Sequence, residues 1–166
     1  MTLEEYGNLV EKAFEIQNWS YSRDDVEDKI IFAINFGENG EYHTKCRVLV
    51  YSSGICDMEA SFPFKCPGEG IIGIKLSYYI ASCNFSKRYA TIRYDFEDGE
   101  IVNSYSFDIL PSMTPEFILD KFNQVNNIDE DEYEYIKDLC MSKNDGEDQI
   151  SEKDDLSKED KFKIDL

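Results

Sequence analysis

The sequence predicts an α+β protein in which helices pack on a five-stranded antiparallel sheet, in the order α-β-β-β-α-β-β-α. Three observations predict this class. The first residues repeat apolar side chains at helical spacing, three strand-like runs follow within 29–62, and an apolar segment at 70–83 separates these runs from a hairpin at 87–108. Because short turns join the strand-like runs, we expect neighbouring strands to be antiparallel.

The chain of 166 residues is long enough for one domain with its own hydrophobic core. Residues 1–141 carry the periodic patterns and form the predicted domain. Residues 142–166 are rich in Asp, Glu, Lys and Ser, with isolated apolar residues, and are predicted to be an acidic polar tail that is frayed or disordered.

The N-terminal helix is predicted to begin at a capping box. Thr2 and Glu5 stand three residues apart, so that the hydroxyl and the carboxylate can each accept a hydrogen bond from a free backbone N–H group. The charged segment 23–28 beyond the helix is expected only to lead into the first strand. The apolar residues of the helix share one face, which predicts a surface helix laid on a core: Leu3, Tyr6, Leu9, Val10, Ala13 and Phe14.

Three strands are predicted next, at 29–36, 42–51 and 56–62, because these runs are rich in β-formers or alternate between apolar and polar residues. Turn residues at 37–40 and 52–54 separate them, with glycine in each turn. The three runs therefore predict an antiparallel meander.

The segment 70–83 is predicted to be a helix for a topological reason. The meander ends at Pro63, and about 14 residues before the next hairpin suit a helix better than one more strand with two turns. Its apolar residues run almost all the way round, whereas a helix on one sheet face needs a single apolar stripe. The apolar residues beyond this single stripe include Ile71, Ile74 and Tyr78. We therefore expect these three side chains to be buried by the C-terminal helix, by a second subunit or by a client.

A second hairpin and two helices are predicted to close the domain. Strands at 87–96 and 101–108 flank Asp98-Gly99, which is typical of a type I′ turn. Thr114, followed by a proline, is typical of a helix N-cap, and a further helix is expected at 129–141 with acidic residues in its first turn.

The formal net charge of −18 limits which kinds of partner the protein is expected to bind. Such a field repels nucleic-acid phosphates and anionic membrane surfaces, so neither nucleic acid nor membrane is expected as a partner. It favours solubility and attracts basic partners. The first residues are acidic and the chain holds no run of about 18 apolar residues, which leads us to expect a cytoplasmic location.

The residues that usually carry chemistry form no catalytic pattern, and no enzyme activity, metal or cofactor is expected. The chain has one histidine, His43, expected on a solvated strand face, and Cys46 three positions on would face the opposite side. The acidic runs lack the register of a calcium loop. The five cysteines are odd in number and widely spaced, which predicts buried free thiols at Cys46, Cys56, Cys66, Cys83 and Cys140.

The element order, together with three local features, resembles the YbjN family, whose fold is similar to that of the type III secretion chaperones. These features are a third strand at 54–62 that ends at a proline, the hairpin at 93–101, and a closing helix opened by Thr114-Pro115-Glu116. The resemblance covers residues 1–141. It implies a small bacterial cytoplasmic α+β protein, often a homodimer, in a family described as sensory-transduction regulators, with no catalytic residue to carry over.

Partner binding has aromatic and aliphatic candidates where the chain leaves the third strand and along the predicted helix at 70–83. Such clusters can form an interface or a groove for a peptide, although aromatic residues in a chain of this size mostly fill the core. Edge strands of the sheet are a second docking surface. The candidate partner-binding residues are Phe62, Phe64, Ile71, Ile74, Tyr78 and Tyr79.

The function expected from the sequence is therefore a non-enzymatic cytoplasmic binding protein of the YbjN or secretion-chaperone type, which recognises a polypeptide partner and has a regulatory role. A homodimer is a further expectation. The alternative is an acidic immunity or inhibitor protein that neutralises a basic toxin or a nucleic-acid-binding enzyme.

Overall fold

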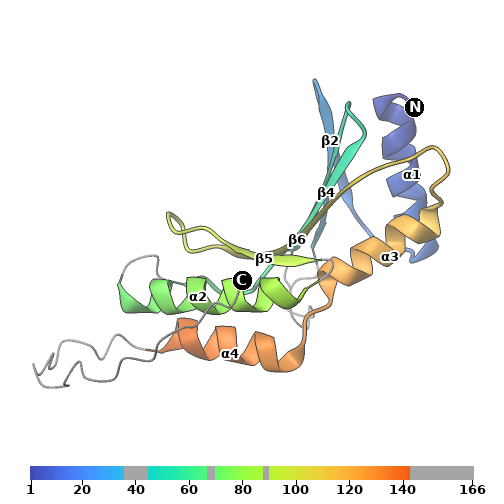
Figure 1. Cartoon of the computed structure of the whole chain (residues 1–166). Coiled ribbons are helices and arrows are strands. Elements are labelled where there is room, and N and C mark those ends of the chain that lie inside the picture. Colours follow the sequence, from blue (N-terminus) through green and yellow to red (C-terminus); the bar gives the residue numbers. More distant parts are fainter. Residues whose placement is uncertain (36–44, 67–69, 88–89, 143–166) are drawn as a thin grey trace, which may run out of the picture.

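The structure is a computed structural model that describes residues 1–35, 45–66, 70–87 and 90–142. In this part of the chain, four α-helices and six strands follow one another in the order α1-β1-β2-β3-β4-α2-β5-β6-α3-α4 (Figure 1). The helices are α1 (Leu3–Ile16), α2 (Ile71–Ser86), α3 (Pro115–Asn126) and α4 (Glu130–Met141). The strands are β1 (Ser22–Val26), β2 (Lys29–Asn35), β3 (Lys45–Tyr51), β4 (Ile55–Ser61), β5 (Thr91–Tyr94) and β6 (Ile101–Asp108).

The strands form one antiparallel sheet in the order β1-β2-β3-β4-β6-β5. The predicted α+β class and antiparallel pairing are confirmed. The predicted five strands and the predicted element order are wrong, because the described sheet has a sixth strand, β1, between α1 and β2.

Strand β1 occupies the segment that the sequence predicted to be a charged lead-in. Its pairing with β2 runs from Ser22 opposite Ala33 to Val26 opposite Lys29. Most of its side chains are exposed, so it lacks the alternation that identifies a half-buried strand. Arg23 fixes it to α1, since its guanidinium lies 2.6 Å from a Glu4 carboxylate oxygen and 3.0 Å from one of Glu11.

The strand ends also differ from prediction. The expected strand 87–96 is wrong at both ends, because Lys87 is the C-cap of α2 and Phe96 lies in the turn after β5. The β5–β6 connection is not a type I′ turn, which would require a positive φ at both Asp98 and Gly99: only Gly99 of these two has one, +74°. The predicted turn at 37–40, residues 42–44 of the second predicted strand, and His43 lie outside the described residues.

The predicted helix starts are confirmed. The Thr2 hydroxyl accepts from Glu5 N–H, and Thr2 N–H donates to the Glu5 carboxylate at 2.6 Å, which completes the capping box. Thr114 caps α3 with proline in the first turn, and Asp129 caps α4. The segment predicted at 70–83 is a helix, and it continues to Ser86.

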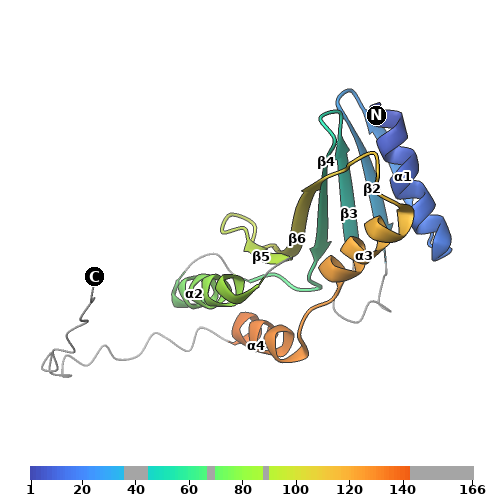
Figure 2. The same cartoon turned by 45° about the vertical axis from the view of Figure 1, so that its right-hand side comes forward.

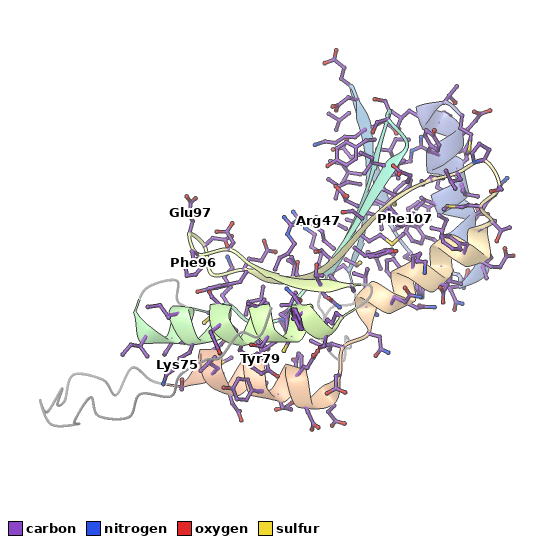
Figure 3. All side chains as sticks on the ribbon, in the orientation of Figure 1. Arg47, Lys75, Tyr79, Phe96, Glu97 and Phe107 are labelled. Carbon is purple, nitrogen blue, oxygen red and sulfur yellow. The ribbon has the colours of Figure 1, made fainter. Side chains whose placement is uncertain are left out.

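The helices cover one face of a bent sheet, as Figures 1 and 2 show. Helices α1 and α3 pack on the β2–β4 part, around aromatic side chains that include Phe14, Phe32 and Phe122. Helices α2 and α4 lie at the β5–β6 end with a second buried cluster that includes Ile92 and Ile101. Figure 3 shows the opposite face of the sheet, which carries Arg47 and which none of the described helices covers.

We predict that Gly99→Ala destabilises the fold by at least about 2 kcal/mol. At φ +74° an L-residue is strained, and an added Cβ would overlap the backbone carbonyl oxygen of Cys66. Equilibrium unfolding in urea measures the loss.

The matched control is Glu97→Ala in the same hairpin, where the side chain is exposed and the expected change is below about 0.5 kcal/mol. Equal unfolding midpoints for Gly99→Ala and the unmodified protein would contradict the close approach of this hairpin to Cys66.

Candidate functional site: the open face of α2 beside α4

Helix α2 is apolar on several sides because each side has a different environment. One side is buried in the second cluster, where Ile72, Leu76 and Ile80 lie with Ile92 and Ile101 of the hairpin strands. The Asn84 side chain fastens the end of the helix to β5, since its amide donates to Ile92 O at 2.8 Å and accepts from Ile92 N–H at 2.9 Å.

A second side of α2 faces α4, which runs antiparallel to it (Figures 1 and 2). The Tyr79 and Tyr135 rings lie 4.1 Å apart, centroid to centroid. One turn earlier on α4, Lys87 Nζ lies 2.7 Å from a Glu132 carboxylate oxygen, and both side chains are largely buried. These contacts join α2 to the N-terminal half of α4.

The third side of α2 is exposed and apolar. Its residues follow one another at intervals of three and four, which places them on one line along the helix. We call this line the open stripe; it consists of Ile71, Ile74, Tyr78, Ala81 and Phe85. The exposed fractions of its large side chains are 64% for Ile71, 68% for Ile74, 79% for Tyr78 and 94% for Phe85.

A groove of about 620 Å³ lies between the open stripe and α4. Its floor includes the paired Tyr79 and Tyr135 rings, and Figure 3 shows Tyr79 and Lys75 on the side of α2 toward α4. The residues that line the groove are Ile74, Lys75, Tyr78, Tyr79, Ser82, Tyr135 and Leu139.

The charge beside the groove is mainly negative. Asp131 and Asp138 stand one helical turn before and after Tyr135 on α4, and both are exposed. Glu134 is also exposed but is paired with Lys137 at 3.1 Å. Lys75 is the basic residue among those that line the groove.

The structure brings together four of the six predicted partner-binding residues. Ile71, Ile74 and Tyr78 lie on the open stripe, and Tyr79 is half-buried in the groove.

The other two predicted residues belong to the second core. Phe62 is only 5% exposed, and its ring stacks on Tyr133 of α4 at 5.8 Å. Phe64 is half-buried, 5.6 Å from the same ring. Phe62 and Phe64 therefore pack against α4, and Phe62 leaves almost no surface for a partner.

Six residues of the open stripe and the groove were not among the predicted partner-binding residues: Lys75, Ala81, Ser82, Phe85, Tyr135 and Leu139. Phe85 continues the spacing of the open stripe, but it lies beyond Cys83, where the predicted helix ends. Tyr135 and Leu139 come from α4, and no local pattern indicates which side of α4 meets α2. Their place follows from tertiary packing.

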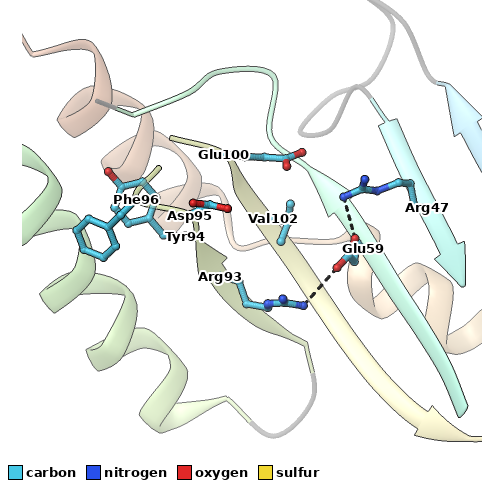
Figure 4. A pocket seen from close by; sticks show the side chains of 8 residues that line it. All are labelled: Arg47, Glu59, Arg93, Tyr94, Asp95, Phe96, Glu100 and Val102. Atoms are coloured by element: carbon cyan, nitrogen blue, oxygen red, sulfur yellow. Dashed lines mark hydrogen bonds and ion pairs between the residues drawn. The ribbon is translucent and has the colours of Figure 1, made fainter. Parts of the chain in front are cut away.

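A second hollow, of about 340 Å³, lies on the uncovered face of the sheet (Figure 4). At its centre Glu59 accepts hydrogen bonds from Arg47 at 2.9 Å and from Arg93 at 3.2 Å. Glu59 pairs with both arginines, and Asp95 and Glu100 also line the hollow, so its carboxylates outnumber its arginines, which disfavours it as an anion site. Nearby Asp95 accepts from Glu97 N–H at 2.8 Å and so shapes the hairpin turn.

The described residues contain no group of three His, Cys, Asp or Glu side chains arranged to hold a metal ion. All five cysteines lie in the described segments and are free. Burial raises the pKa of the Cys46 and Cys56 thiols, to about 12 for Cys46. Cys83 is half-buried, and its pKa is also raised by burial.

Within the described segments, no helix combines the length and apolarity needed to cross a membrane. Comparisons with protein-family models, with curated proteins and with solved structures gave no match for this chain.

We predict that Cys83 is the thiol that reacts first in the folded protein, because it is the least buried of the five cysteines. At pH 8 an aromatic disulfide reagent should modify about one thiol in native buffer, and slowly, since the raised pKa of Cys83 lowers its thiolate fraction. The other four thiols should react only in denaturant.

The variant Cys83→Ser should lose the reaction seen in native buffer, while the other four thiols should still react in denaturant. If Cys83→Ser still reacts in native buffer, another of the cysteines is more accessible in the folded protein than Cys83.

Proposed function

We propose that this protein is a non-enzymatic polypeptide-binding protein whose docking surface is the open stripe of α2 with the adjoining groove. The observation that carries the proposal is the row of large, exposed apolar side chains on a single helix face. Scattered exposed apolar residues are ordinary, but an aligned row beside an apolar groove is typical of an interaction surface.

The energetics require that a partner fill the groove as well as cover the stripe. Full burial of one large apolar side chain contributes roughly 1.5–3 kcal/mol. The four large side chains of the stripe therefore offer at most on the order of 6–12 kcal/mol, which is comparable to the cost of association itself. Contacts with Tyr135 and Leu139 in the groove supply the additional burial that a measurable affinity needs.

The resemblance to the YbjN family is compatible with the same proposal, because it implies no catalytic residue. In this proposal the protein acts in the cytoplasm and regulates its partner by holding it. The acidic surface keeps the complex soluble.

A second candidate, an immunity or inhibitor protein against a basic toxin or nucleic-acid-binding enzyme, draws on the net charge of −18 and on the exposed Asp131 and Asp138. Salt separates the two candidates. An inhibitor that relies on electrostatic steering loses association rate steeply between 50 and 500 mM NaCl, in order-of-magnitude steps, whereas a complex held by the open stripe keeps most of its affinity.

We predict that Ile74→Asp and Tyr78→Asp each weaken binding of the native partner by at least about 30-fold, since each places a charge in an apolar contact. A photo-crosslinking amino acid at position 82, in the groove, identifies the partner and the bound segment. The purified partner is then titrated by calorimetry against each variant.

The matched control is Leu110→Asp, an equally drastic change at a half-exposed side chain between β6 and α3. The free energy of unfolding of all three variants should lie within about 0.5 kcal/mol of that of the unmodified protein. If Leu110→Asp weakens binding while Tyr78→Asp does not, the docking surface lies elsewhere and the proposal fails.

A further inference from the structure

We infer that the bound segment is an amphipathic helix of about four turns with basic residues beside its apolar face, and that it lies along α2 in the groove as a third helix next to α4. This inference rests on the proposed function and specifies its partner.

The first argument is the spacing of the open stripe. Its residues follow the alternation of three and four that repeats every seven residues, from Ile71 through Tyr78 to Phe85. Side chains in this repeat interlock with those of a second helix that carries the same repeat. Phe85 stands 14 positions after Ile71, so the stripe is about 21 Å long at 1.5 Å per residue, which matches a partner helix of about four turns.

The second argument is the backbone hydrogen bonding of the bound segment. An extended peptide obtains its backbone hydrogen bonds from a sheet edge. The N–H and C=O groups in the middle of α2 already bond within the helix, so they offer nothing to an extended chain. A segment buried on this surface must therefore satisfy its own backbone groups, and a helix does so.

The third argument is the shape of the site. Helices α2 and α4 are antiparallel neighbours, joined at the Tyr79 and Tyr135 rings and by the Lys87–Glu132 pair. The groove between them is the place where a third helix makes contact with both, as in a small helical bundle.

The fourth argument is charge. A helix in the groove contacts Tyr135, and the exposed Asp131 and Asp138 stand one helical turn before and after that residue on α4. Lysine or arginine beside the apolar face of the partner would offset these carboxylates. A second copy of the chain would instead bring another set of the same α4 carboxylates to the groove. Charge therefore favours a basic partner helix over a homodimer.

The experiment uses the full chain and three synthetic 18-residue peptides labelled with fluorescein. The first carries leucine at the interlocking positions and lysine or arginine beside them. The second has the same composition in a scrambled order that abolishes the apolar face. The third replaces the basic residues with glutamate. Fluorescence anisotropy at 150 mM NaCl measures their dissociation constants, and sedimentation velocity measures the oligomeric state of the protein without peptide.

We expect the basic amphipathic peptide to bind at least 10-fold more tightly than either of the others. Tyr78→Asp should weaken its binding by at least 10-fold, and the double variant Asp131→Asn with Asp138→Asn by about threefold to tenfold. Leu110→Asp should leave it unchanged. Circular dichroism should show additional helix on binding.

Three results would overturn the inference. A basic helix is excluded as the occupant if the scrambled or the acidic peptide binds as tightly as the basic one, or if the basic peptide does not bind. The proposed function still holds after either result if binding of the partner crosslinked at position 82 depends on Tyr78. A crosslinked segment that is extended or acidic excludes a basic helix in the same way. A dimer that Tyr78→Asp dissociates shows that a second copy covers the stripe, and it overturns both proposals.

Discussion

The packing of α2 between the β5–β6 end of the sheet and α4 is the constraint on which the candidate site depends. The inner side of α2 is fixed by Leu76 in the second cluster and by the two hydrogen bonds between Asn84 and Ile92. Helix α4 is placed in turn by Phe62 and Phe64 against Tyr133. The groove exists because these contacts hold the two helices at a set separation while leaving the third side of α2 free.

The remaining surfaces are less suited to a polypeptide. The edge strand β1 is charged, and Arg23 bonds to Glu4, Glu11 and Asp25, so that an added strand would meet a network of charges. The opposite edge, β5, is only four residues long in the described structure. On the uncovered sheet face, Glu59 already occupies both arginines of the hollow. Apolar recognition therefore has its best location on α2.

Much of the fold could be predicted from the sequence because its signals are local. The capping box at Thr2, the N-cap at Thr114 and the topological argument for α2 each depend on a short stretch of chain. Strand β1 could not be predicted, since most of its side chains are charged, most are exposed, and its pairing with β2 is seen only in three dimensions. For the same reason the sequence could not separate Phe62, which is buried against α4, from Tyr78, which is exposed.

The acidic surface and the open stripe have complementary effects on association. An exposed apolar row promotes self-association, and a net charge of −18 opposes it because every copy repels every other. At physiological ionic strength charges act over about 8 Å, so only carboxylates close to the groove, such as Asp131 and Asp138, influence what binds there. In the proposed complex, affinity derives from the stripe and selectivity from its acidic border, while the distant charge opposes association between copies of the unoccupied protein.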